Sequence, residues 1–242
     1  MLLNSNLSID ENFELLETML YYRGKIYLKH YHMQRLYNSI KQLKFIQYSY
    51  SDINNIFLNL ENSLYLNYSF TDNKYCIRFL LSQNGEINYS INLLSDMPIH
   101  GIKDNKIQLV MASDYIDYNY SNIYERNNIL WLHKTNIRKH YNKIYDNTKL
   151  KYQNTNFSDI VLYNKEGYVT ESSRANLAIL DKNNLFITPP IKYGLLAGTM
   201  RQHLLYSKIL TCKPITIEDI INAKYILWFN SLRGIYSAQL SS

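Results

Sequence analysis

Three ionisable side chains stand in polar stretches where they could do chemistry: Arg35, Lys134 and Glu171. A lysine amine attacks a carbonyl carbon only after it loses its proton, which requires a desolvated or cation-flanked site that lowers its pKa. An arginine suits a phosphate because its planar fork stays charged and binds two oxygens together. A buried carboxylate is costly unless it has a partner. Taken singly, each residue reads as an ordinary exposed side chain, so a functional role depends on the segments around it.

These residues belong to segments that follow one another along nearly the whole chain. In order, the segments are Leu16-Glu17-Thr18-Met19 with Gly24-Lys25 and His32-Met33-Gln34-Arg35-Leu36; His133-Lys134-Thr135-Asn136-Ile137-Arg138; Gly167-Tyr168-Val169-Thr170-Glu171-Ser172-Ser173-Arg174-Ala175-Asn176-Leu177; Pro189-Pro190 with Leu195-Leu196-Ala197-Gly198-Thr199-Met200-Arg201; and Asn230-Ser231-Leu232-Arg233-Gly234. Their order and spacing resemble the class IV aminotransferase family, the fold-type IV enzymes that use pyridoxal 5'-phosphate. Within it, the first, third and last segments are most similar to the 4-amino-4-deoxychorismate lyases.

The resemblance implies a catalytic set on the reacting side of the cofactor. Lys134 would form the Schiff base with pyridoxal phosphate, and afterwards act as general base. Thr18 would assist it in delivering a proton to the departing group. Glu171 would pair with the pyridine nitrogen and keep it protonated, so that the ring accepts electrons.

The resemblance also implies a set of residues around the cofactor phosphate and the substrate. Arg35 would contact the phosphate, and the free N–H groups of a helix that begins at Thr199 and Met200 would cradle it. Near the far end of the chain, Asn230 and Ser231 would lie close to the phosphate, and Arg233 would face a substrate carboxylate.

The implied function is that of a lyase which removes pyruvate from aminodeoxychorismate and gives 4-aminobenzoate for folate synthesis. The main alternative is a branched-chain or D-amino-acid aminotransferase of the same family, because the lysine, the glutamate and the phosphate cup serve both reactions. Leu20 stands where some of those transaminases carry a substrate arginine, which favours the lyase. A third reading is a non-enzymatic module that binds anions or nucleic acid; Lys134 and Glu171 argue against it.

Composition excludes other classes. The chain has 242 residues, with 26 Lys and Arg against 20 Asp and Glu, a net charge of +6. The basic residues are scattered, so a nucleic-acid surface is not expected. Cys76 and Cys212 are the two cysteines and have no CxxC spacing, so neither a disulfide framework nor a metal site is expected. The sequence shows no signal peptide and no apolar run of about 18 residues, so we expect a cytoplasmic protein with no membrane contact.

Local patterns predict an α/β (α+β) chain of two domains: a small N-terminal α/β domain over 1–111, an interdomain segment over 112–120, and a larger barrel-like C-terminal domain over 121–242 that carries the lysine. The family resemblance implies a homodimer acting on a small-molecule substrate. The predicted strands cover 13–22, 25–28, 75–82, 86–94, 106–111, 159–164, 168–171, 176–180, 185–188 and 225–229, and the predicted helices 30–43, 52–66, 127–145, 199–210 and 217–223.

Overall fold

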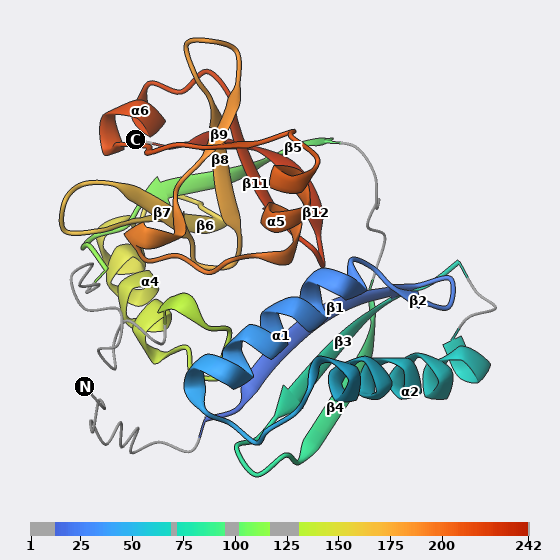
Figure 1. Ribbon diagram of the computed structural model, residues 1–242. Helices are drawn as coiled ribbons and strands as arrows, with labels where there is room; N and C mark the ends of the chain where they lie inside the picture. The colour runs from blue at the N-terminus through green and yellow to red at the C-terminus, as the bar shows by residue number, and fades with distance from the viewer. Residues whose placement is uncertain (1–12, 69–71, 95–101, 117–130, 242) are drawn as a thin grey trace.

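Two β-sheets organise the chain (Figure 1). The structure is a computed structural model that describes residues 13–68, 72–94, 102–116 and 131–241. The first sheet has four antiparallel strands in the order β2-β1-β3-β4. These strands are β1 (Leu15–Tyr22), β2 (Lys25–Ile26), β3 (Lys74–Leu81) and β4 (Ile87–Leu94).

Both hairpins predicted in this half are present, and their turns explain why. Arg23 and Gly24 join β1 to β2 with φ angles of 47° and 78°. Two successive residues with positive φ match the twist of a two-residue hairpin. In the turn between β3 and β4, Gly85 has a φ of 92°, a conformation that glycine adopts without a steric penalty.

Two helices pack on the first sheet: α1 (Lys29–Leu43) and α2 (Tyr50–Tyr68). In α1 the spacing of Met33, Leu36 and Ile40 puts one apolar stripe into the core between helices and sheet. Figure 1 shows that α1 also faces the C-terminal half of the molecule. There the ring of Tyr31 lies 5.7 Å from that of His203, in α5 (Thr199–Tyr206).

The second sheet has eight strands in the order β10-β9-β8-β11-β12-β5-β6-β7. It mixes parallel and antiparallel pairs and curls around a core that includes Leu109, Val161, Leu177 and Trp228. The strands are β5 (Ile102–Met111), β6 (Asp159–Tyr163), β7 (Val169–Ser172), β8 (Asn176–Leu180), β9 (Phe186–Thr188), β10 (Thr211–Cys212), β11 (Ile226–Asn230) and β12 (Gly234–Leu240). The helices of this half, besides α5, are α4 (Lys139–Lys151), α6 (Ile217–Ile221) and the short helix η1 (Ile191–Tyr193). The predicted mixed fold with a barrel-like second sheet is confirmed.

Two sequence predictions about the sheets differ from the structure. Strand β5, assigned to a first domain of 1–111, pairs with β12 and β6 of the second sheet. Strand β12 itself was not predicted, although it joins β5 to β11. Both differences have one cause: β12 and β5 pair across more than 120 residues of chain, and period-two patterning cannot say which strand is the partner.

The helix predicted over 127–145 is also different. Residues 127–130 lie outside the described part of the chain, and α4 begins only at Lys139. Residues 131–132 are helical as predicted, but residues 133–138 are not, because Thr135 forms a bridge with Leu15 of β1. Tertiary pairing thus overrides the local helical tendency at Lys134. No helix among the described residues is long and apolar enough to cross a membrane.

Candidate active site

Lys134 is fixed by a short antiparallel pairing with the start of β1. The N–H of Leu16 donates to the Lys134 carbonyl at 2.9 Å, and that of Asn136 donates to the Glu14 carbonyl at 3.0 Å. Asn136 and Glu14 add two side-chain hydrogen bonds of 3.0 and 2.9 Å. These contacts join the two halves of the molecule at the lysine. The Lys134 side chain lines a pocket, which Thr18 of β1 also lines.

The environment of Lys134 prepares its amine to act as a nucleophile or base. Burial, together with the Arg35 and Arg138 guanidinium groups, lowers the pKa of Lys134 to about 8 against the opposing effect of Glu17 and Glu171. A lysine with a pKa near neutrality holds an appreciable neutral fraction at physiological pH. This is the condition that the sequence analysis set for a reactive lysine.

Glu171 is a buried carboxylate in β7, held at both oxygens by neutral groups. The Tyr141 hydroxyl of α4 donates to Oε1 at 2.7 Å, and Asn176 Nδ2 of β8 donates to Oε2 at 3.2 Å. Burial raises the pKa of Glu171 to about 7, and the hydrogen bonds oppose this rise. Neither neighbour supplies a full positive charge, so the carboxylate is suited to a cationic partner from the pocket.

The turn that follows Glu171 rests on a second buried carboxylate, Asp159. Its oxygens accept hydrogen bonds from the hydroxyls of Ser172 and Ser173 at 2.8 and 2.5 Å, and from Trp228 Nε1 at 2.9 Å. On the pocket side, Arg138 Nη2 donates to the Ser173 carbonyl at 2.5 Å. The backbone next to Glu171 is therefore anchored from two directions.

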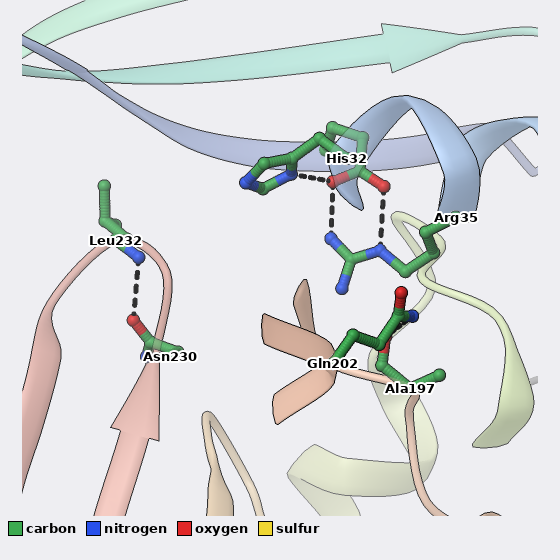
Figure 2. A network of polar contacts seen from close by, with 7 residues as sticks. His32, Arg35, Ala197, Gln202, Asn230 and Leu232 are labelled. Atoms are coloured by element: carbon green, nitrogen blue, oxygen red, sulfur yellow. Dashed lines mark hydrogen bonds and ion pairs between the residues drawn. The ribbon is translucent and has the colours of Figure 1, made fainter. Parts of the chain in front are cut away.

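Arg35 lies in α1 with its guanidinium against the buried carboxylate of Glu17. Its Nε donates to Glu17 Oε1 at 2.8 Å and its Nη2 contacts Oε2, while His32 Nδ1 lies 2.6 Å from Oε2 (Figure 2). Burial opposes the ionised form of Glu17, but the Arg35 charge and the hydrogen bonds from Arg35 and His32 outweigh it and lower the pKa of Glu17 to about 2. The charge of Arg35 is thus paired, although the side chain still lines the pocket.

The beginning of α5 offers unused N–H groups to the same pocket. The first N–H to bond within the helix is that of Gln202, which donates to the Gly198 carbonyl at 2.9 Å. The N–H groups at Thr199 and Met200 therefore have no acceptor inside the helix. Gln202 Nε2 donates to the Ala197 carbonyl at 3.1 Å and fixes the preceding loop (Figure 2). The Met200 side chain points into the apolar core instead.

The turn between β11 and β12 closes another side of the pocket. Asn230 Oδ1 accepts from the N–H groups of Leu232 and Arg233 at 3.1 and 2.7 Å, and its Nδ2 donates to the Arg174 carbonyl at 3.1 Å. Asn230 thereby shapes the turn and ties it to the loop after β7. Arg233 is exposed at the pocket mouth, and Ser231 is buried beside it.

The structure brings eight of the nine site residues predicted from the sequence into this one pocket; the ninth, Met200, is not among the residues that line it. The sequence analysis did not assign roles to Glu17, Tyr141, Arg174 and Asn176. Arg174 and Asn176 lie within the motifs and could have been singled out there. For Tyr141 and Glu17 the only signal is long-range packing. Among the described residues, no group of three His, Cys, Asp or Glu side chains is placed to hold a metal.

Comparison with known proteins agrees with this geometry. The family model of class IV amino-transferases matches residues 14–240. The chain belongs to the class IV aminotransferase family. It is therefore a member of an enzyme family, as the motifs predicted.

Individual relatives of this family member cover most of its length. It is 30% identical over 229 residues to a Schizosaccharomyces pombe protein named "Putative aminodeoxychorismate lyase", an alignment that covers 93% of this chain and 88% of the relative. Among solved structures, a Mesorhizobium loti protein titled a "Putative amino-acid aminotransferase" has a TM-score of 0.74 at 26% identity, covering 95% of this chain and all of the other. A hypothetical aminotransferase from Mycobacterium tuberculosis in a PLP-bound form has a TM-score of 0.73 at 17% identity, covering 100% and 86%.

Proposed function

We propose that this family member is a pyridoxal-phosphate-dependent 4-amino-4-deoxychorismate lyase. The observation that carries the proposal is the placement of Lys134 and Glu171 in one pocket, an amine with a lowered pKa and a buried carboxylate whose side-chain hydrogen-bond partners are neutral. The likeness to the S. pombe relative over nearly the full chain favours the lyase within the family.

The pocket residues fit the cofactor. The pyridine nitrogen, when protonated, is the cationic partner that Glu171 is suited to pair with. The free N–H groups at Thr199 and Met200, together with Ser231 and the remaining N–H groups of Arg35, suit a phosphate. Asn230 contributes by holding the turn beside them.

The chemistry divides between the cofactor and the chain. Pyridoxal phosphate, when bound through Lys134, supplies an electron sink for the carbon that bears the substrate amine. Once the substrate amine had replaced the Lys134 amine on the cofactor, the freed Lys134 would take the proton from that carbon as general base, and Glu171 would keep the ring nitrogen charged. Lys134 and Thr18 deliver a proton to the departing enolpyruvyl group. Its loss makes the substrate ring aromatic, so that 4-aminobenzoate and pyruvate are formed.

The substrate carries carboxylates, and the mouth of the pocket is basic. Arg233 lies there on the turn after β11, exposed and within reach of a substrate. Among the described residues, no Asp or Glu forms an ion pair with it. We assign the recognition of a substrate carboxylate to Arg233. The pocket is walled by residues from both sheets, so a substrate bound there is shielded from water by both halves of the chain.

A coupled assay tests the proposal. Purified protein is mixed with pyridoxal phosphate, chorismate, glutamine and an aminodeoxychorismate synthase, and 4-aminobenzoate and pyruvate are followed. Equal amounts of the two products, absent with Lys134→Ala, support the lyase. Bound cofactor without either product would reject it in favour of a branched-chain or D-amino-acid aminotransferase, which a screen of amino donors then tests.

Two further expectations belong to the same proposal. The family resemblance supports a homodimer, which sedimentation of the purified protein at several concentrations checks; a monomer at all concentrations would contradict it. It also supports a location in the cytoplasm, which cell fractionation checks.

A further inference from the structure

Tyr141 of α4 is one of two neutral side chains, with Asn176, that donate a hydrogen bond to the Glu171 carboxylate. Its hydroxyl donates to Oε1 at 2.7 Å, a short distance that is typical of a charge-assisted bond. Burial, followed by the nearby Glu171 charge, raises the pKa of Tyr141 well above its usual value of 10.0. The phenol therefore keeps its proton and can only donate to the carboxylate.

The ring of Tyr141 is held so that this hydroxyl has little freedom. The Trp131 ring lies 4.8 Å away in an edge-on arrangement, and the Arg138 guanidinium lies over the Tyr141 ring at 4.8 Å from its centre. Arg138 is itself tied to the Ser173 carbonyl. Arg138 and Ser173 line the same pocket as Tyr141 and Glu171.

We propose that Tyr141 is a positioning residue that holds Glu171 as a carboxylate, aimed at the cofactor ring. That Glu171 faces the cofactor ring rests on the proposed function, whereas the effect of Tyr141 on the charge of Glu171 does not. A hydrogen bond to the ionised form of a buried acid favours that form, and here it opposes the desolvation that favours the neutral acid. Without the hydroxyl, Glu171 would be protonated at neutral pH and would lose the charge that its role requires.

Other charged and polar groups also face Glu171 and act on the same equilibrium. Lys134 and Arg138 approach from the segment before α4, and Arg201 acts from α5. Asn176 donates from β8, and the Leu196 N–H adds a backbone hydrogen bond. All of these remain in place when only the Tyr141 hydroxyl is removed, so Tyr141→Phe isolates its effect.

The first experiment follows Glu171 in the cofactor-free protein. Infrared difference spectra give the C=O stretch of the protonated acid as a function of pH, and Glu171→Gln identifies the band by removing it. Wild type should titrate at about 7, and Tyr141→Phe should titrate about 1–2 pH units higher, the worth of a hydrogen bond to a charged group. Tyr145→Phe is the matched control, because Tyr145 lies in the same helix as Tyr141 and its ring packs on Phe157. It should titrate like wild type.

A second variant should shift the Glu171 midpoint in the opposite direction while it keeps the hydrogen bond. Fluorotyrosine placed at position 141 has a more acidic phenol, donates a stronger hydrogen bond, and should lower the Glu171 midpoint. If both this protein and Tyr141→Phe titrate like wild type, the proposal is wrong. The fluorinated protein also keeps the test valid should Tyr141→Phe fail to fold.

The holoenzyme separates this inference from the proposed function. With cofactor and substrate present, Tyr141→Phe should lower kcat while KM stays constant, and the acid limb of the pH–rate profile should move upward with the Glu171 midpoint. A wild-type protein that binds no pyridoxal phosphate would reject the proposed function, and the infrared titration would still decide the role of Tyr141.

Discussion

The Arg35 guanidinium lies against the buried Glu17 carboxylate and donates to it through Nε and Nη2. Two of its N–H groups are thereby used, and a guanidinium has five. His32 contacts the same carboxylate at 2.6 Å and is fully buried. Glu17 therefore fixes the direction in which the rest of Arg35 faces the pocket, and it also balances one positive charge next to Lys134.

Removal of Glu17 should destabilise the fold strongly. Glu17→Ala leaves the Arg35 charge buried and unpaired, which costs about 3–5 kcal/mol. Urea unfolding followed by circular dichroism measures this loss. The matched control is Asp72→Ala, since Asp72 binds Arg23 in a similar two-nitrogen contact, with side chains that are 82% and 66% exposed. The control should leave the unfolding curve almost unchanged. Equal losses in the two variants would contradict the prediction.

His133 should make the protein less stable as the pH falls. Its Nδ1 lies 2.9 Å from the Ser39 hydroxyl, and burial lowers the pKa of His133 from 6.5 to about 4. Below pH 6.5 the unfolded chain then holds more protons than the folded one, so stability is lost as the pH falls from 6.5 toward 4, by up to about 1.4 kcal/mol per pH unit. Glu171, whose pKa is raised, acts in the opposite direction in this range. The difference between wild type and His133→Gln isolates the histidine; parallel curves would refute the prediction.

The amine of Lys134 should titrate well below those of the surface lysines. Its pKa is about 8, mainly because of burial and secondly because of Arg35. In the cofactor-free protein, the rate at which an amine reagent labels Lys134 should rise with pH to a plateau with a midpoint near 8. Peptide mass spectrometry resolves the labelling of this site from that of exposed lysines such as Lys149. In Arg35→Gln the Lys134 midpoint should move upward, because a neighbouring cation is lost. A Lys134 midpoint in wild type near about 10.4, the value of an unperturbed lysine, would contradict the prediction.

The sequence located the candidate site better than it located the contacts that support it. Lys134, Glu171 and Arg35 stand in motifs whose information is local, so their segments could be found without a structure. Tyr141 lies 30 residues before Glu171 and is one of 24 tyrosines, and nothing in its local pattern separates it from the others. The extended segment at Lys134 was predicted as helix because its pairing with Leu15 and Leu16 depends on a strand far away in the chain. The strands of the first sheet were predicted well, since each hairpin is closed by a local turn.

Gly198 should be required because of one neighbouring side chain. A Cβ added at Gly198 would lie 1.9 Å from Asn176 Oδ1, so Asn176 would have to move. Asn176 is buried and donates both to Glu171 and to the Leu196 carbonyl at 3.0 Å. Gly198→Ala should therefore lower the free energy of unfolding by about 1–3 kcal/mol, the cost of leaving buried polar groups unpaired.

A double-mutant cycle shows whether Asn176 is the cause. Asn176→Ala removes the obstructing oxygen together with its hydrogen bonds, so a methyl group at position 198 then meets only Arg201 Cβ, at an ordinary contact distance of 3.8 Å. Gly198→Ala should be nearly neutral in that background, and the coupling energy should equal most of its cost in wild type. Urea unfolding of the four proteins gives this energy. If Gly198→Ala costs the same in both backgrounds, the loss comes from the backbone of the loop before α5, and Asn176 has no part in it.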